Sequence, residues 1–146
     1  KQQSTKPQTL GYALADSPSG QMAWIVEKFH DWSDCGPENG GHPENVFSRD
    51  HLLDNVMLYW LNNAGASSGR LYWHSFAQPN LEPITMPSGC SLFPHEIMRA
   101  SRRWAETRFK NIVHFNSVER GGHFAAMERP EAFVDEVRTC FAQMSL

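Results

Sequence analysis

The chain has 146 residues, enough for one modest domain, and its apolar share of 40% allows a core of limited size. A net charge of −3 at pH 7 and the lack of any long apolar run argue against nucleic acid and membrane-spanning roles, and any N-terminal membrane anchor would lie outside this segment. Three isolated cysteines without a Cys-x-x-Cys pair argue against a disulfide framework or zinc knuckle and favour a reducing, cytoplasmic compartment.

The first half of the chain is predicted to be mainly helical. Its polar start is expected to be extended before Pro7, and Asp16-Ser17-Pro18 is a typical helix start. Glycines and prolines predict a surface loop over residues 34–47. Ser48 is placed to cap the next helix, and a shorter helix is expected through residues 70–76.

After Pro79 the hydrophobic period changes. A short buried strand is expected within residues 84–92, a helix over 96–109, a second strand over 111–118 and a last helix from Pro130. Strand, helix, strand and helix in this order predict a parallel strand pair with a right-handed crossover.

A parallel pair is normally buried inside a larger sheet, and two strands alone are marginal. We therefore expect this α/β chain to hold only two strands of a sheet whose other strands lie elsewhere. Residues 1–78 then form a helical cap (lid) segment, and residues 79–146 belong to the core.

Two loops after the predicted strands carry groups suited to acid–base chemistry. In Arg120-Gly121-Gly122-His123-Phe124, the glycines allow a backbone that directs the His123 imidazole out of the strand end. Glu96 follows the preceding strand, and open α/β sheets place ligands at this carboxyl edge. A carboxylate there can hold the histidine tautomer and stabilise the imidazolium. The structural alternatives are a histidine in a surface turn and a first-turn helix glutamate.

Tyr72 lies in the helical half beside Arg70 and Trp73. A phenol can donate a hydrogen bond to an oxygen that gains charge in a transition state. A packed aromatic is the alternative for Tyr72, and Tyr59 is the next candidate for the donor.

No metal or cofactor site is expected from the sequence. His30 and His42 lie in or near the loop of residues 34–47, but no Asp, Cys and His set of fitting spacing surrounds them. We expect both side chains to be solvated.

Six blocks in this order resemble the microsomal-type epoxide hydrolases of the α/β-hydrolase family, which include insect juvenile-hormone epoxide hydrolases. The resemblance covers nearly the whole chain and is weakest over residues 61–75. The blocks are Thr5-Lys6-Pro7-Gln8-Thr9, Leu14-Ala15-Asp16-Ser17-Pro18, Glu27-Lys28-Phe29, Asn55-Val56-Met57-Leu58-Tyr59-Trp60, Phe93-Pro94-His95-Glu96-Ile97 and Arg120-Gly121-Gly122-His123-Phe124-Ala125-Ala126.

The resemblance implies hydrolysis of a small-molecule epoxide by water to a vicinal diol, through an ester with an aspartate nucleophile. By motif, Glu96 matches the charge-relay acid, His123 the water-activating base and Tyr72 one of two cap tyrosines. The nucleophile elbow and the His-Gly-x-Pro oxyanion loop of the family do not occur in this sequence. The chain thus resembles the C-terminal part of an α/β-hydrolase fold, a cap piece with the last two parallel strands and their helices.

The partner that this resemblance implies is the N-terminal half of the same enzyme, and a homodimer is left open. Alone, the chain is expected to be inactive and to fold poorly. Two other functions stay open: another α/β-hydrolase, such as a haloalkane dehalogenase or esterase, and a non-catalytic hydrolase-like fragment. The elbow residue would separate the enzymes, because a Gly-x-Ser-x-Gly motif there would indicate an esterase.

Overall fold

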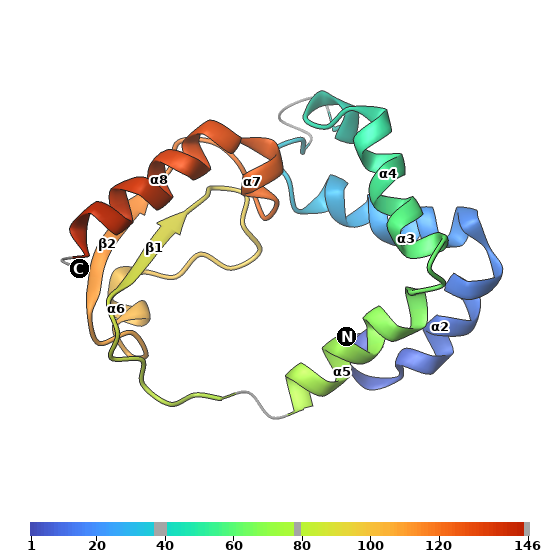
Figure 1. The fold of residues 1–146 in the computed structure, drawn as a ribbon, viewed down its shortest axis with the longest axis horizontal. Helices are drawn as coiled ribbons and strands as arrows, with labels where there is room; N and C mark the ends of the chain where they lie inside the picture. Colours follow the sequence, from blue (N-terminus) through green and yellow to red (C-terminus); the bar gives the residue numbers. More distant parts are fainter. Residues whose placement is uncertain (37–40, 78–79, 145–146) are drawn as a thin grey trace. The chain divides into compact units, whose positions relative to one another are not determined.

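The chain forms two compact units, each with its own internal contacts (Figure 1). The computed structural model describes residues 1–36, 41–77 and 80–144. One unit comprises Lys1–Lys28 and Phe47–Asn80, and the other comprises Phe29–Val46 and Leu81–Leu146. These compact units are defined by contacts within the chain. The division into a cap of residues 1–78 and a core of residues 79–146 stays a prediction.

The first unit is helical. It contains α1 (Gln2–Thr5), α2 (Pro7–Asp16), most of α3 (Pro18–Asp31), α4 (Arg49–Trp60) and α5 (Gly65–Ala77). Helix α5 runs alongside α2 (Figure 1). Two glycines permit this approach: a Cβ at Gly11 would lie 2.6 Å from the Ala66 Cβ, and one at Gly65 would lie 2.7 Å from the Leu14 Cβ. A larger residue at either position would push the helices apart.

The sequence predicted some helix starts in this unit correctly and missed others. Ser48 caps α4 as expected, its Oγ accepting the N–H of His51 at 3.2 Å. The prediction of extended chain before Pro7 was wrong, because Gln2–Thr5 form helix α1, and Pro7 then starts α2. Helix α5 begins at Gly65, before the helix expected through residues 70–76, since close packing on α2 outweighs the low helix propensity of glycine.

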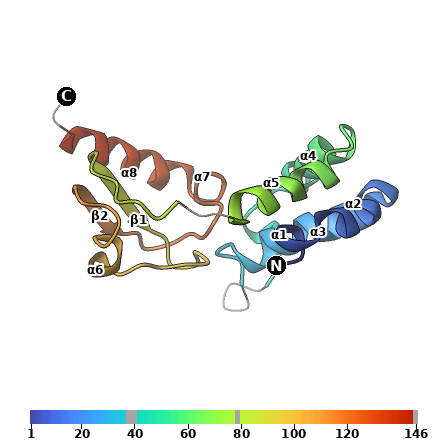
Figure 2. The same cartoon turned by 90° about the horizontal axis from the view of Figure 1, so that it is seen from below.

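The second unit contains the two strands. Its elements are the 3-10 helix η2 (Pro43–Asn45), β1 (Ser88–Leu92), α6 (Arg102–Ala105), β2 (Ile112–Ser117), α7 (Ala125–Glu128) and α8 (Pro130–Gln143). The strands pair in parallel, with Gly89 opposite His114 and Leu92 opposite Ser117. Helix α8 packs along both strands (Figure 2), and Cys140 Sγ occupies the space that a side chain at Gly89 would need. The predicted parallel pair and the helix from Pro130 are confirmed.

The helix predicted over residues 96–109 was wrong, because only α6 is helical there. The Glu96 carboxylate instead accepts the N–H of Ile97 at 2.7 Å, a local bond that competes with helix formation. Ser101 caps α6, and Phe109 then pairs with Ile84 in an isolated parallel bridge. The strand expected within residues 84–92 therefore forms over its second part, as β1, and Ile84 makes only this bridge.

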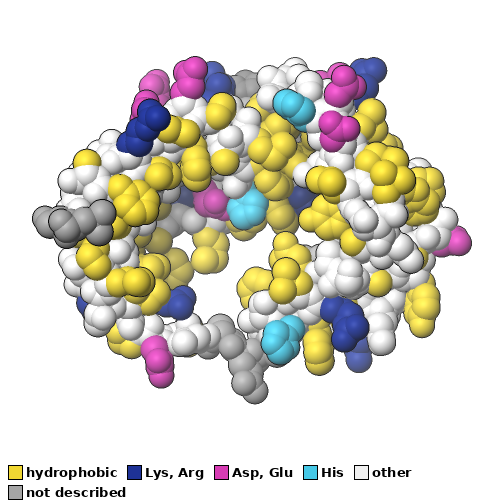
Figure 3. All heavy atoms as spheres, viewed as in Figure 1, with side chains coloured by type: hydrophobic (Ala, Val, Ile, Leu, Met, Phe, Trp, Pro, Cys, Tyr) yellow, Lys and Arg dark blue, Asp and Glu magenta, His cyan; other side chains and the backbone are white. Residues whose placement is uncertain are grey.

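Large apolar side chains remain exposed on both units (Figure 3). Helix α8 has no buried residue, although its apolar residues lie at helical spacing. The apolar side chains of α8 that are at least 38% exposed are Phe133, Val134, Val137 and Phe141. Among the described residues, no helix has the length and apolar character that a membrane crossing requires.

Candidate active site

The loops that follow β1 and β2 continue side by side beyond the strand ends. Val118 N–H donates to the Leu92 carbonyl at 2.9 Å, and His95 N–H donates to the Gly121 carbonyl at 3.0 Å. His95 and Gly122 form a further parallel bridge. The pairing therefore brings the loop after β1 against the loop after β2, as expected at the carboxyl edge of a parallel sheet.

Glu96 and His123 meet where these loops pair. The Oε1 atom of Glu96 lies 2.7 Å from the Nδ1 atom of His123. The two side chains are 32% and 40% exposed, so solvent reaches the pair. Because a carboxylate only accepts hydrogen bonds, the proton of this contact belongs to Nδ1, and neutral His123 then presents Nε2 as an acceptor. An imidazole in this state can take a proton from a water molecule.

The backbone before His123 fits only glycine. Gly121 has φ of +113°, and a Cβ there would lie 2.9 Å from the Phe93 ring. At Gly122 a side chain would collide with the carbonyl oxygen of Trp32. His123 N–H donates to that same oxygen at 2.7 Å. The two glycines therefore let the loop lie directly against residues 32 and 33.

Aromatic rings flank the His123 imidazole. Trp32 meets it edge-on, with ring centroids 5.3 Å apart, and Phe124 does so at 5.1 Å. Phe124 stacks in turn on Phe29, with centroids 4.3 Å apart. These contacts restrict the orientation of the imidazole while leaving it partly open to solvent.

Two buried carboxylates near this loop were missed by the sequence analysis. Asp34 is 3% and Glu128 6% exposed. Burial alone would raise the pKa of Asp34, but the charge and hydrogen bond of Arg120, together with Arg129 and His95, outweigh it and hold the pKa below its usual value. Asp34 was assigned to the surface loop of residues 34–47, and no local pattern in the sequence distinguished it from its neighbours.

Tyr72 lies on α5 in the helical unit, whereas Glu96 and His123 lie in the other unit. Its side chain is 42% exposed and stacks on Phe76, with centroids 6.1 Å apart. Tyr59, the next candidate for the same role, lies on α4 and is half-buried.

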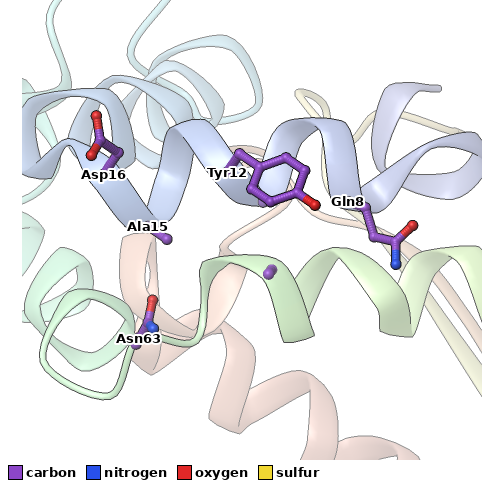
Figure 4. Close-up of a pocket in the computed structure, with 7 residues that line it drawn as sticks. Gln8, Tyr12, Ala15, Asp16 and Asn63 are labelled. Carbon is purple, nitrogen blue, oxygen red and sulfur yellow. The ribbon is translucent and has the colours of Figure 1, made fainter.

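A cavity of about 370 Å³ lies in the helical unit, and none of the residues predicted to be catalytic lines it. In Figure 4 the Tyr12 side chain extends from α2 toward Gln8, and Asn63 lies near Ala15, in the turn before α5. Its lining lacks a histidine and a cysteine. Among residues 1–36, 41–77 and 80–144, no group of three or more His, Cys, Asp or Glu side chains could hold a metal ion.

Known proteins are similar to this chain in sequence and in fold. No family model matches. The chain is 51% identical over 144 residues to a Stigmatella aurantiaca protein that carries the epoxide hydrolase name, and 37% identical over 145 residues to pig epoxide hydrolase 1. These alignments cover 97% and 93% of this chain and 32% of each relative, so the chain spans about a third of their length.

Solved structures give the same result. The juvenile hormone epoxide hydrolase of the silkworm Bombyx mori matches with a TM-score of 0.88 and 33% identity, over 97% of this chain and 38% of that one. An Aspergillus niger epoxide hydrolase matches with a TM-score of 0.81 and 32% identity, over 97% of this chain and 34% of that one. The predicted fold class, part of an α/β-hydrolase fold, is thereby confirmed.

Proposed function

Because this chain is homologous to the epoxide hydrolases over nearly its whole length, we propose that it supplies the water-activating half of such an enzyme. In this proposal, Glu96 is the charge-relay acid, His123 the base and Tyr72 one of two oxygen-holding tyrosines. The nucleophilic aspartate comes from an N-terminal half outside these residues. One observation carries the proposal: the solvent-accessible Glu96–His123 hydrogen bond at the carboxyl edge of β1 and β2.

The first chemical step opens the epoxide. The aspartate carboxylate attacks a ring carbon, a C–O bond forms to the enzyme and the ring C–O bond breaks. The epoxide oxygen gains negative charge during this step, and the Tyr72 hydroxyl donates a hydrogen bond that stabilises it. The epoxide oxygen takes the proton of the tyrosine that donates to it, so the products are a hydroxyalkyl ester of the enzyme and a tyrosinate.

The second step hydrolyses this ester. His123 Nε2 takes a proton from water, the resulting hydroxide attacks the ester carbonyl carbon, and the diol leaves with the proton that the imidazolium returns. Glu96, on Nδ1, stabilises the imidazolium while it exists. The carboxylic acid that remains on the aspartate returns its proton to the tyrosinate of the first step, which regenerates both groups, and the net reaction adds one water to one epoxide.

The test uses the full-length enzyme, meaning these residues together with the segment that supplies the nucleophile. The purified enzyme is mixed with styrene oxide in a single turnover, and covalent adduct and diol are measured by mass spectrometry. We expect a transient adduct in the wild type and a persistent adduct in His123→Gln, because the ester then forms without being hydrolysed. His51→Gln, at an exposed position on α4, is the matched control and should behave as wild type.

Failure is equally clear in this experiment. Absence of both adduct and diol from every epoxide tested, in a folded enzyme, would contradict epoxide hydrolysis. Turnover of haloalkanes or carboxylic esters in parallel assays would then favour another α/β-hydrolase, and inactivity on all three would favour a non-catalytic role.

The role of Tyr72 is tested in the first step. Tyr72→Phe keeps the ring and removes the hydroxyl, so ring opening should slow by about 10-fold or more while ester hydrolysis is little changed. Loss of one oxyanion donor costs about 10² to 10³ in a serine protease, and the second tyrosine would soften the effect here. Tyr12→Phe, with a side chain 78% exposed on α2, is the control. An unchanged alkylation rate would move the role to Tyr59.

The 146 residues alone should not turn over epoxides, because the sequence contains neither the nucleophile elbow nor the oxyanion loop. Co-expression with the N-terminal half should raise solubility, since exposed apolar side chains such as Phe133 and Phe141 would find partners. Turnover by the purified chain above a heat-killed control would contradict this part of the proposal. Cytoplasmic location also stays a prediction.

A further inference from the structure

One buried carboxylate contacts both loops of the candidate site. The Oδ1 atom of Asp34 lies 3.3 Å from His95 Nε2, in the residue directly before Glu96. Its Oδ2 atom accepts the N–H of Gly121 at 3.2 Å, two residues before His123. The same carboxylate therefore links the loop that carries the acid to the loop that carries the base.

Two arginines compensate the buried charge of Asp34. Arg120 Nε donates to Oδ2 at 3.1 Å, and Arg129 Nη2 does so at 3.4 Å. The Asp34 side chain is only 4% exposed, whereas those of Arg120 and Arg129 are 55% and 34% exposed. A buried carboxylate needs such partners, and with them Asp34 remains ionised at neutral pH.

Glu128 holds the backbone of Asp34. Its Oε2 atom accepts the N–H of Asp34 at 2.8 Å, and its Oε1 atom accepts the N–H of Phe124 at 3.0 Å. Three backbone N–H groups of the histidine loop are therefore hydrogen-bonded. Gly121 N–H donates to Asp34, and His123 N–H donates to the Trp32 carbonyl. Phe124 N–H donates to Glu128. Residues 32–34 form a clamp on the histidine loop.

We propose that Asp34 is a positioning residue, which holds the loop of Glu96 against the loop of His123 and so sets the hydrogen bond between them. Its contacts support this role over general stabilisation, because they fall on the neighbours of the acid and of the base. The catalytic consequence rests on the proposed function, whereas the positioning itself does not.

The kinetic test is Asp34→Asn in the full-length enzyme, which keeps the shape and removes the charge. If Asp34 acts through the Glu96–His123 pair, only ester hydrolysis slows. When ester hydrolysis limits turnover, kcat and KM both fall with its rate. We expect each to fall by about 10-fold, a loss typical of residues that orient a functional group, with kcat/KM nearly unchanged. A merely structural role predicts less active enzyme, hence a lower kcat with an unchanged KM. Asp31→Asn, at a side chain 50% exposed, is the matched control.

A double-mutant cycle sharpens the test. In the Glu96→Gln background, Asp34→Asn should slow ester hydrolysis by less than about 2-fold, because the contact that it positions is already lost. Independent effects that multiply would overturn the proposal. If Asp34→Asn does not fold, His95→Asn removes the contact between Asp34 and the acid loop and keeps the bond between Asp34 and Gly121, and it should likewise lower kcat and KM together. Wild-type kinetics in a folded His95→Asn enzyme would then overturn the proposal.

A spectroscopic test does not depend on turnover. In the ¹⁵N-histidine NMR spectrum, assigned with His123→Gln, wild-type His123 should show the Nδ1–H tautomer with a downfield proton. Asp34→Asn should lose that signal and Asp31→Asn should keep it. A wild type without epoxide turnover would contradict the proposed function and leave this test standing, whereas an unaltered His123 signal in Asp34→Asn would overturn the positioning role.

Discussion

Two of the histidine–carboxylate pairs in the second unit have the same separation but different surroundings. Glu96 lies 2.7 Å from His123, and Glu136 lies 2.7 Å from His114. The side chains of the first pair are 32% and 40% exposed, whereas those of the second are 16% and 8% exposed. The first pair lies in loops beyond the strand ends, and the second connects α8 to the middle of β2.

The Glu136 carboxylate accepts hydrogen bonds from side chains of the two strands. Ser91 Oγ donates to Glu136 at 2.7 Å and Asn116 Nδ2 at 2.6 Å, in addition to His114. Burial would raise the pKa of Glu136, but the hydrogen bonds from His114, Ser91 and Asn116 lower it below its usual value. A short hydrogen bond alone therefore does not mark a candidate catalytic pair, and the two pairs differ in solvent access and in position relative to the sheet edge.

The largest expected difference between the pairs is in activity. Glu96→Gln in the full-length enzyme should slow ester hydrolysis by up to about 10⁴-fold, the loss seen when a triad acid becomes an amide. Glu136→Gln should leave the rate within a few-fold, because His114 has no access to substrate. Single-turnover measurement of adduct decay checks both. An equal loss in a well-folded Glu136→Gln enzyme would break the comparison.

For stability, we expect Glu136→Gln to have the larger effect and Glu96→Gln the smaller one. Glu136→Gln leaves three donors around a neutral amide, so we expect the free energy of unfolding to fall by about 3 kcal/mol, as for a broken buried pair. Glu96→Gln should cost less than about 1 kcal/mol, because its pair is half-exposed. Urea denaturation of the full-length enzyme gives both values. Glu131→Gln, at an exposed position in the first turn of α8, is the control and should change little.

The pH dependence of stability should follow the second pair. Because the folded-state pKa of Glu136 lies below its ordinary 4.5, its contribution is complete above pH 4.5 and is lost as pH falls through the folded pKa. Wild type should therefore lose more stability than Glu136→Gln below about pH 4.5. Urea midpoints compared at neutral and acidic pH measure this difference. Parallel pH profiles for the two proteins would exclude Glu136 as the titrating group.

The smallest effect is expected from a single partner of Glu136. Ser91→Ala removes one of its three donors, and the free energy of unfolding should fall by about 1 kcal/mol. Ser67→Ala, exposed on α5, serves as the reference for loss of a hydroxyl. A loss as large as that of Glu136→Gln would mean that the network is all-or-none and not a sum of separate bonds.

The sequence predicted the two residues of the candidate site, Glu96 and His123, but not the buried residue Asp34 that contacts both of their loops. Glu96 and His123 could be placed together because each follows a strand of one parallel pair, whose ends share an edge. Asp34 could not be placed there, since its bond to Gly121 joins residues 87 positions apart and leaves no local pattern. The helix expected over residues 96–109 was wrong for a related reason: the Glu96 carboxylate accepts the N–H of Ile97 and contacts His123, and hydrophobic periodicity reveals neither bond.

The clamp on the histidine loop has a consequence for folding kinetics. The bonds of Asp34 to Gly121 and to Glu128 close chain loops of 87 and 94 residues, and long-range contacts of this kind are slow to form. We therefore expect the clamp to be absent from the folding transition state. Asp34→Asn should then accelerate unfolding while hardly changing the refolding rate, a φ-value near zero that chevron analysis can measure. The site would be among the last parts of the protein to assemble and the first to open.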